Sequence, residues 1–287
     1  MPAKYLTAFL FLVGALIGAA AIVMLRKPAG DVASSTANAP HAAAGTAPAD
    51  AALTAAPPAP APAAAPEAAP ATAREAQVAD VRIDATVAWL RQRFPAGFPD
   101  LTAAEALELK SLDFQNVPLT DADLAMLAPL VNLEDLGLRG TAVTDAGLAH
   151  LSGMAQLRGV GLRGTKLDGS GLAALPAGVE RLDLTDTQVS EAALGNLSGR
   201  RALSNVKLNR LKLGDAAIAT ISTLPGLEKV ELDVTAITDV GLRRLVEDNP
   251  RLRRIEVRYT RTSAELADEL SRQRPGLEIV QQGFGIR

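Results

Sequence analysis

The 287-residue sequence contains no cysteine, two histidines, one tryptophan, two tyrosines and six phenylalanines. The absence of cysteine excludes disulfide bonds, thiolate metal sites and a cysteine nucleophile. Two histidines are too few for the usual multi-histidine metal centres, so we expect no metal site and no cofactor. The 29 basic and 32 acidic side chains nearly balance. That balance argues against a nucleic-acid-binding protein, which needs a surplus of basic residues.

Common catalytic motifs are also missing. The sequence contains no nucleophile elbow, no phosphate-binding glycine loop and no zinc-protease motif. His41 and His150 lie far apart in the sequence, and no pair of acidic residues stands out from the rest. We therefore expect a protein that is not an enzyme and that has no small-molecule substrate.

An apolar segment lies near the N-terminus. Residues 5–25 carry no charge, and basic residues flank them on both sides. As a helix, this segment would be about 31 Å long, which matches a hydrocarbon core of about 30 Å. We predict an uncleaved signal anchor, that is, a transmembrane helix preceded by a short tail at residues 1–4. A cleaved signal peptide, with its cleavage site near residues 18–21, is the alternative.

Residues 28–75 are rich in alanine and proline and contain few larger aliphatic residues. Such a segment buries too little apolar surface to offset the entropy of ordering it, so we predict a disordered linker. The segment resembles the tethers of bacterial envelope proteins. Basic residues near the apolar segment do not decide its orientation. On the resemblance we predict a single-pass protein of the inner (cytoplasmic) membrane with a periplasmic C-terminal domain.

The rest of the chain is repetitive. The pattern Leu-x-x-Leu-x-Leu and its variants begin at Leu109, Leu133, Leu157, Val179, Leu203, Leu227 and Leu252, with a partial eighth copy at Leu277. Each copy continues with a segment such as Thr-Asp-x-Gly-Leu-x-x-Leu, found at residues 144–151. We interpret each copy as a short strand, a turn and a short helix. The third copy is shorter than its neighbours around Pro176, so we expect a trimmed helix or turn there.

These motifs resemble the leucine-rich repeat family, and the resemblance extends from residue 109 to about residue 280. It implies an α/β solenoid of about seven repeats of 22–25 residues, with a parallel sheet on the concave face. Many family members have asparagine where this chain has Thr141, Thr165, Thr187, Thr235 and Thr260. Threonine offers one hydroxyl, so we expect fewer bonds between neighbouring turns.

Both ends of a solenoid need covering. Residues 80–108 contain Trp89, Phe94 and Phe98, and we predict that they form an N-terminal cap. Residues 109–287 would then hold the repeats and a C-terminal cap.

Candidate binding residues lie on the concave face that the resemblance implies. Side chains between the buried leucines point outward by strand alternation, and the second and third repeats place glycine there, with an arginine two positions later. The two arginines would stack beside an aspartate that could compensate their charge, and they would match a carboxylate or phosphate on a protein partner. The candidate partner-binding residues are Asp135, Gly137, Arg139, Gly161, Arg163 and Asp183. Alternatively, the Leu-Arg-Gly-Thr shared by both repeats reflects a recent duplication without a function.

Residues 243–274 are rich in arginine and also contain acidic residues. The pattern is typical of a solvated face with ion pairs, each of which contributes little. The alternative is a patch that binds an acidic partner or an anionic lipid.

We therefore predict a non-enzymatic protein–protein interaction module. It would be displayed from a membrane on a flexible spacer and would bind a protein partner through the concave sheet face. One alternative is a secreted effector of the leucine-rich repeat type, because segments such as residues 147–151 are similar to repeats of bacterial effectors that recruit host proteins. Another is a structural tether of the cell envelope that binds peptidoglycan or another polymer.

Overall fold

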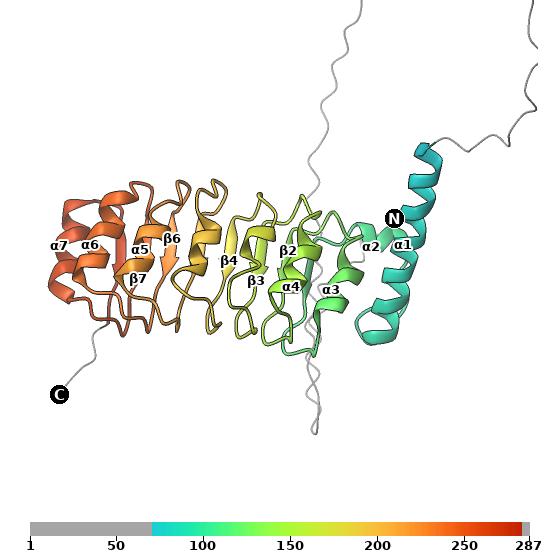
Figure 1. Ribbon diagram of the computed structural model, residues 1–287, viewed down its shortest axis with the longest axis horizontal. Coiled ribbons are helices and arrows are strands. Elements are labelled where there is room, and N and C mark those ends of the chain that lie inside the picture. Colours follow the sequence, from blue (N-terminus) through green and yellow to red (C-terminus); the bar gives the residue numbers. More distant parts are fainter. Residues whose placement is uncertain (1–70, 283–287) are drawn as a thin grey trace, which may run out of the picture.

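A computed structural model describes residues 71–282, which form one elongated solenoid (Figure 1). The predicted transmembrane helix at residues 5–25 and residues 28–70 of the predicted linker lie outside the described residues. Within residues 71–282, none of the helices combines the length and the apolar character needed to cross a bilayer.

Eight strands form a parallel sheet in which each strand pairs with the next one along the chain. The strands are β1 (Ser111–Asp113), β2 (Asp135–Gly137), β3 (Gly159–Gly161), β4 (Arg181–Asp183), β5 (Asn205–Lys207), β6 (Lys229–Glu231), β7 (Arg254–Glu256) and β8 (Glu278–Val280). The register is constant, so that Leu112 at the centre of β1 lies beside Leu136 at the centre of β2. The predicted parallel sheet is confirmed, and the partial eighth copy contributes β8.

Short helices cover one side of the sheet (Figure 1). The α-helices are α1 (Ala71–Arg93), α2 (Ala103–Leu107), α3 (Asp121–Leu127), α4 (Asp145–Leu148), α5 (Asp215–Ile221), α6 (Asp239–Asp248) and α7 (Ala264–Gln273). The 3-10 helices are η1 (Ala149–Leu151), η2 (Leu172–Ala174) and η3 (Ala193–Leu197). In the short third repeat, the helical half consists of η2 alone, which confirms that this half is trimmed.

A ladder of aliphatic side chains fills the space between the sheet and the helices. The central residues of β1 to β7 are at most 3% exposed, and Leu124, Leu148 and Leu242 on the facing helices are fully buried. Burying one such side chain contributes about 2 kcal/mol. Because each repeat completes the burial of its neighbours, the strands gain their stability from stacking.

The end of the solenoid at β1 is covered by α1 and α2. Helix α1 begins at Ala71, inside the range predicted as linker, and packs against α2 and α3. Near its end, the ring of Phe94 lies 5.1 Å from that of Phe114 and meets Trp89 edge to face. The aromatic residues of this region therefore shield the first rung of the aliphatic ladder.

Hydrogen bonds accepted by aspartate side chains join consecutive repeats on the helical side. Asp121, the first residue of α3, accepts from the backbone N–H of Thr144 at 2.7 Å and from its hydroxyl at 2.6 Å. A Cβ atom at Gly147 would lie 2.4 Å from the Asp121 carboxylate, so only glycine leaves room for it. Equivalent bonds join Asp215 to Thr238 and Asp239 to Ser263. The motif Thr-Asp-x-Gly thus connects one repeat to the next.

The threonines that replace asparagine serve only their own repeat. Each hydroxyl donates to the carbonyl three residues earlier, at 2.7 or 2.8 Å; the donors are Thr141, Thr165, Thr187, Thr235 and Thr260. This geometry confirms the expectation that fewer bonds join neighbouring turns at this position.

A residue with left-handed backbone follows each strand from β1 to β7. These residues are Asn116, Gly140, Gly164, Asp186, Arg210, Val234 and Tyr259. Glycine adopts this conformation without strain, whereas a β-branched residue such as Val234 does so at a cost of about 1–2 kcal/mol. The turns after β2 and β3 are therefore relaxed, and the turn after β6 is strained.

Candidate protein-binding surface

The constant register arranges the solvent-facing side chains of the sheet in two rows. The strand-start row contains Ser111, Asp135, Gly159, Arg181, Asn205, Lys229, Arg254 and Glu278. The strand-end row contains Asp113, Gly137, Gly161, Asp183, Lys207, Glu231, Glu256 and Val280. The character of the concave face therefore follows from these two rows.

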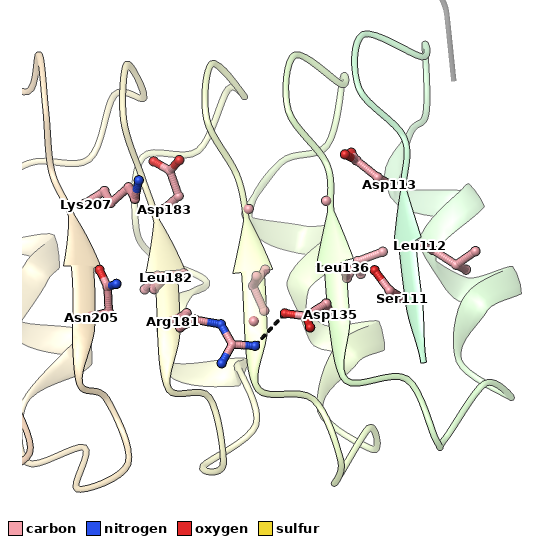
Figure 2. A pocket seen from close by; sticks show the side chains of 14 residues that line it. Ser111, Leu112, Asp113, Asp135, Leu136, Arg181, Leu182, Asp183, Asn205 and Lys207 are labelled. Carbon is pink, nitrogen blue, oxygen red and sulfur yellow. Dashed lines mark hydrogen bonds and ion pairs between the residues drawn. The ribbon is translucent and has the colours of Figure 1, made fainter. Parts of the chain in front are cut away.

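Two glycines in the strand-end row open a shallow hollow of about 290 Å³, lined by residues of β1 to β5. The Asp113 side chain leans toward β2, and a Cβ atom at Gly137 would lie only 2.4 Å from its Oδ1 atom (Figure 2). Gly161 is open, because the nearest atom to a Cβ there would be the Gly137 Cα at 3.7 Å. Asp183 lies beside Gly161 on the next strand, β4.

An ion pair crosses the strand-start row of the hollow. The Arg181 Nη2 atom lies 2.7 Å from Asp135 Oδ1, two strands away (Figure 2). The pair passes over Gly159, where a Cβ atom would lie 2.0 Å from Asp135 Oδ1. From the sequence, Asp135 was expected to compensate the stacked arginines. That assignment is wrong, because Arg181 occupies the carboxylate.

The structure divides the six predicted partner-binding residues into two groups. Asp135, Gly137, Gly161 and Asp183 line the hollow. The other two, Arg139 and Arg163, lie in successive turns after β2 and β3, where the Gly140 N–H donates to the Arg163 carbonyl at 2.8 Å. Among the described residues, neither guanidinium has a carboxylate within ion-pair distance. They flank the hollow and do not line it.

Two acceptor oxygens in the hollow are buried without a hydrogen-bond partner among the described residues, Asp113 Oδ1 and Asn205 Oδ1. The other oxygen of Asp113 accepts from Gln115 Nε2 at 2.6 Å. Asp183 Oδ1 accepts from the Thr185 N–H at 2.9 Å. Asp113 and Asn205 were not among the binding residues predicted from the sequence. The strand-end position of Asp113, which mirrors that of Asp183 across the glycines, is the signal that could have identified it.

In contrast, ion pairs cover the concave face from β5 to β8. Glu231 is 7% exposed and accepts from Lys229 Nζ at 2.7 Å and from Lys207 Nζ at 3.2 Å. Glu256 is 6% exposed, and its Oε1 atom lies 2.9 Å from the Arg254 Nε atom. The Nη1 atom of the same arginine forms an ion pair with Glu278. This region needs no partner to neutralise its buried carboxylates.

These contacts shift several pKa values. Burial acts to raise the pKa of Glu231, but hydrogen bonds from Lys229 and Asn209, together with the contacts of Lys207, hold it below its ordinary value. The same hydrogen bond with Glu231 raises the pKa of Lys229. Burial is also the largest influence on Glu256, and the bond from Arg254 helps to bring its pKa below the ordinary value. All three groups therefore keep their charges at neutral pH.

The arginine-rich segment 243–274 is largely engaged within the fold. Ion pairs involve Arg243, Arg244, Arg251, Arg254 and Arg258. The Arg274 guanidinium instead donates to carbonyls after α6, among them Asn249 O at 2.8 Å. These contacts favour the interpretation as a solvated, ion-paired face.

The fold has counterparts among solved structures. Internalin C2 from Listeria monocytogenes superposes with a TM-score of 0.50 at 21% identity, over 70% of this chain and 86% of that one. An internalin, InlF, from the same species gives a TM-score of 0.44 at 18% identity, over 69% and 73% of the two chains. No protein-family model matches the sequence, and no curated protein matches it significantly. The repeating strands, the parallel sheet and the likeness to internalin C2 identify residues 109–280 as a leucine-rich-repeat solenoid.

Proposed function

We propose that this protein is a non-enzymatic interaction module that binds a protein partner through its concave sheet face. The observation that carries the proposal is the hollow above Gly161, which is open and flanked by the carboxylates of Asp113 and Asp183. The sheet around it is held rigidly by the buried aliphatic ladder, so a partner can dock with little rearrangement.

We further propose that residues 5–25 anchor the protein in the inner membrane and that residues 28–70, which precede α1, hold the solenoid in the periplasm. A proline-rich spacer of this length reaches at most about 130 Å, and a flexible coil averages nearer 35 Å. A reporter fused after residue 75 tests the topology. Cell fractionation tests the anchor, because recovery in the culture medium would favour the alternative of a secreted effector.

Crosslinking of the full chain in native membranes tests the interaction directly. Gly161→Trp fills the hollow without a backbone clash, since its Cβ position is open. Gly195→Trp is the matched control, because Gly195 lies in η3 on the helical side and has no atom within 4 Å of its Cβ position. We expect Gly161→Trp to remove crosslinked partners and Gly195→Trp to keep them. Equal crosslinking by both variants would contradict binding at this surface.

A further inference from the structure

We infer that the hollow receives a basic side chain, arginine or lysine, from the protein partner. The inference rests on the proposed function and adds the chemistry of the partner to it. Two carboxylates that line the hollow, those of Asp113 and Asp183, form no ion pair with the described residues.

The lining of the hollow retains negative charge. Arg181 forms an ion pair with Asp135, and Lys207 forms one with Glu231 in the neighbouring strand. Among the described residues, no cation lies within ion-pair distance of Asp113 or Asp183. A cation from outside would therefore meet two carboxylates that no internal pair neutralises.

Hydrogen bonding points the same way. Asp113 Oδ1 and Asn205 Oδ1 are acceptors, and both are buried without a donor among the described residues. Leaving a buried acceptor unpaired is unfavourable, so a ligand that brings N–H groups gains more here than one that brings oxygens. Guanidinium and ammonium groups carry donors and no acceptors.

The spacing suits an organic cation better than a metal ion. Asp113 and Asp183 are three strands apart, or roughly 14 Å between backbones, and the two glycines lie between them. No group of three or more His, Cys, Asp or Glu in the described part of the chain could hold a metal ion. A guanidinium or ammonium on a long side chain can reach the open floor at Gly161 and donate to the carboxylates around it.

The neighbouring arginines orient the partner. Arg139 and Arg163 follow the two glycines by two residues, so they lie on one flank of the hollow. They repel a second cation on that flank and favour an acidic group there. The partner's basic residue is thus directed to the floor at Gly161 and away from the turns.

A displayed library of random peptides, selected on the purified full chain, tests the inference. Peptides are counted as hollow-dependent when Gly161→Trp abolishes their binding and Gly195→Trp does not. We expect these peptides to be enriched in arginine and lysine. We expect their affinity to fall at least tenfold when Asp113→Asn and Asp183→Asn are combined.

The matched control for the charge change is Glu247→Gln combined with Asp268→Asn, because both residues are exposed, on α6 and α7. It should leave the affinity unchanged. Hollow-dependent peptides without basic residues, or with equal affinity for the Asp113/Asp183 variant, would overturn the inference while leaving concave-face binding intact. Absence of any hollow-dependent peptide would overturn it too. The proposed function itself fails only if partner crosslinking is insensitive to Gly161→Trp.

Discussion

Across β5 to β8, each acidic side chain of the two rows has a basic partner, whereas across β1 to β4 only Asp135 does. Both regions share one backbone register and one buried aliphatic ladder. The buried central residue of each strand stabilises the sheet in both regions. The strand-start and strand-end rows can therefore differ in charge without a change of fold. One half of the face neutralises its own carboxylates, and the other retains Asp113 and Asp183 without a basic partner among the described residues.

The largest expected effect comes from breaking the self-neutralised half. Glu231→Gln removes the charge that faces Lys207 and Lys229, and we expect it to lower the free energy of unfolding by about 2 kcal/mol. Asp113→Asn likewise removes one carboxylate charge, from the half formed by β1 to β4. No cation loses its partner there, so we expect the free energy of unfolding to change by less than about 0.5 kcal/mol. Urea unfolding of the two variants measures the difference, and equal losses would contradict the comparison.

The next largest effect is a difference in stability between alanine substitutions at two glycines of β3. A methyl group at Gly159 would displace the half-exposed Asp135–Arg181 pair, and we expect Gly159→Ala to cost up to about 1 kcal/mol. A methyl group at Gly161 would make only ordinary van der Waals contact, 3.7 Å from the Gly137 Cα. Gly161→Ala should be neutral or should stabilise the strand by up to about 1 kcal/mol. Thermal unfolding of both variants checks the order, and a larger loss at Gly161 would show that the hollow is not open.

The turns extend the comparison with a smaller effect. Glycine occupies the left-handed position after β2 and β3, whereas Val234 occupies it after β6. Val234 is 45% exposed, so Val234→Gly removes little packing and relieves backbone strain. We expect a gain of about 1 kcal/mol, measured by denaturant unfolding. Gly164→Val, which places the same side chain in the opposite half, should lose about as much.

The smallest effect is a difference in pH dependence. The pKa values of Glu231 and Glu256 lie below the unfolded value of 4.5, so their stabilisation is complete above about pH 4.5 and is lost as the pH falls through the lower folded values. Burial raises the pKa of Asp233, which opposes this trend. We expect the melting temperature to fall below pH 4.5 and to fall less in Glu231→Gln. Identical acid profiles would exclude a role for this network.

Sequence reasoning predicted the strand positions, the parallel sheet and the concave glycines because each depends on a pattern that recurs every 22–25 residues. It expected Arg139 and Arg163 to stack on the concave face, whereas both lie in the turns after β2 and β3 and outside the lining of the hollow. It could not predict that Asp135 pairs with Arg181, because that contact joins side chains 46 residues apart and exists only where Gly159 lets it pass. Contacts that skip a repeat depend on the residue in between, and the repeat pattern carries no sign of them.

The hydrogen bonds that aspartate side chains accept on the helical side connect each repeat to the one that follows it in the sequence. These junctions consist of an acidic side chain in one repeat, aspartate or Glu191, and a donor 23 or 24 residues later in the next. A tandem duplication of one whole repeat copies both halves of the junction, so an added repeat arrives with its connections already complete. On entering the short third repeat, Asp145 accepts in the same way from the Asp168 N–H, 23 residues later, and also from the N–H groups of Gly169 and Gly171. In the third repeat, Gly169 stands at the position of Asp145 and has no side chain that could accept such a bond. Lengthening by duplication is therefore easiest away from the step between the third and fourth repeats.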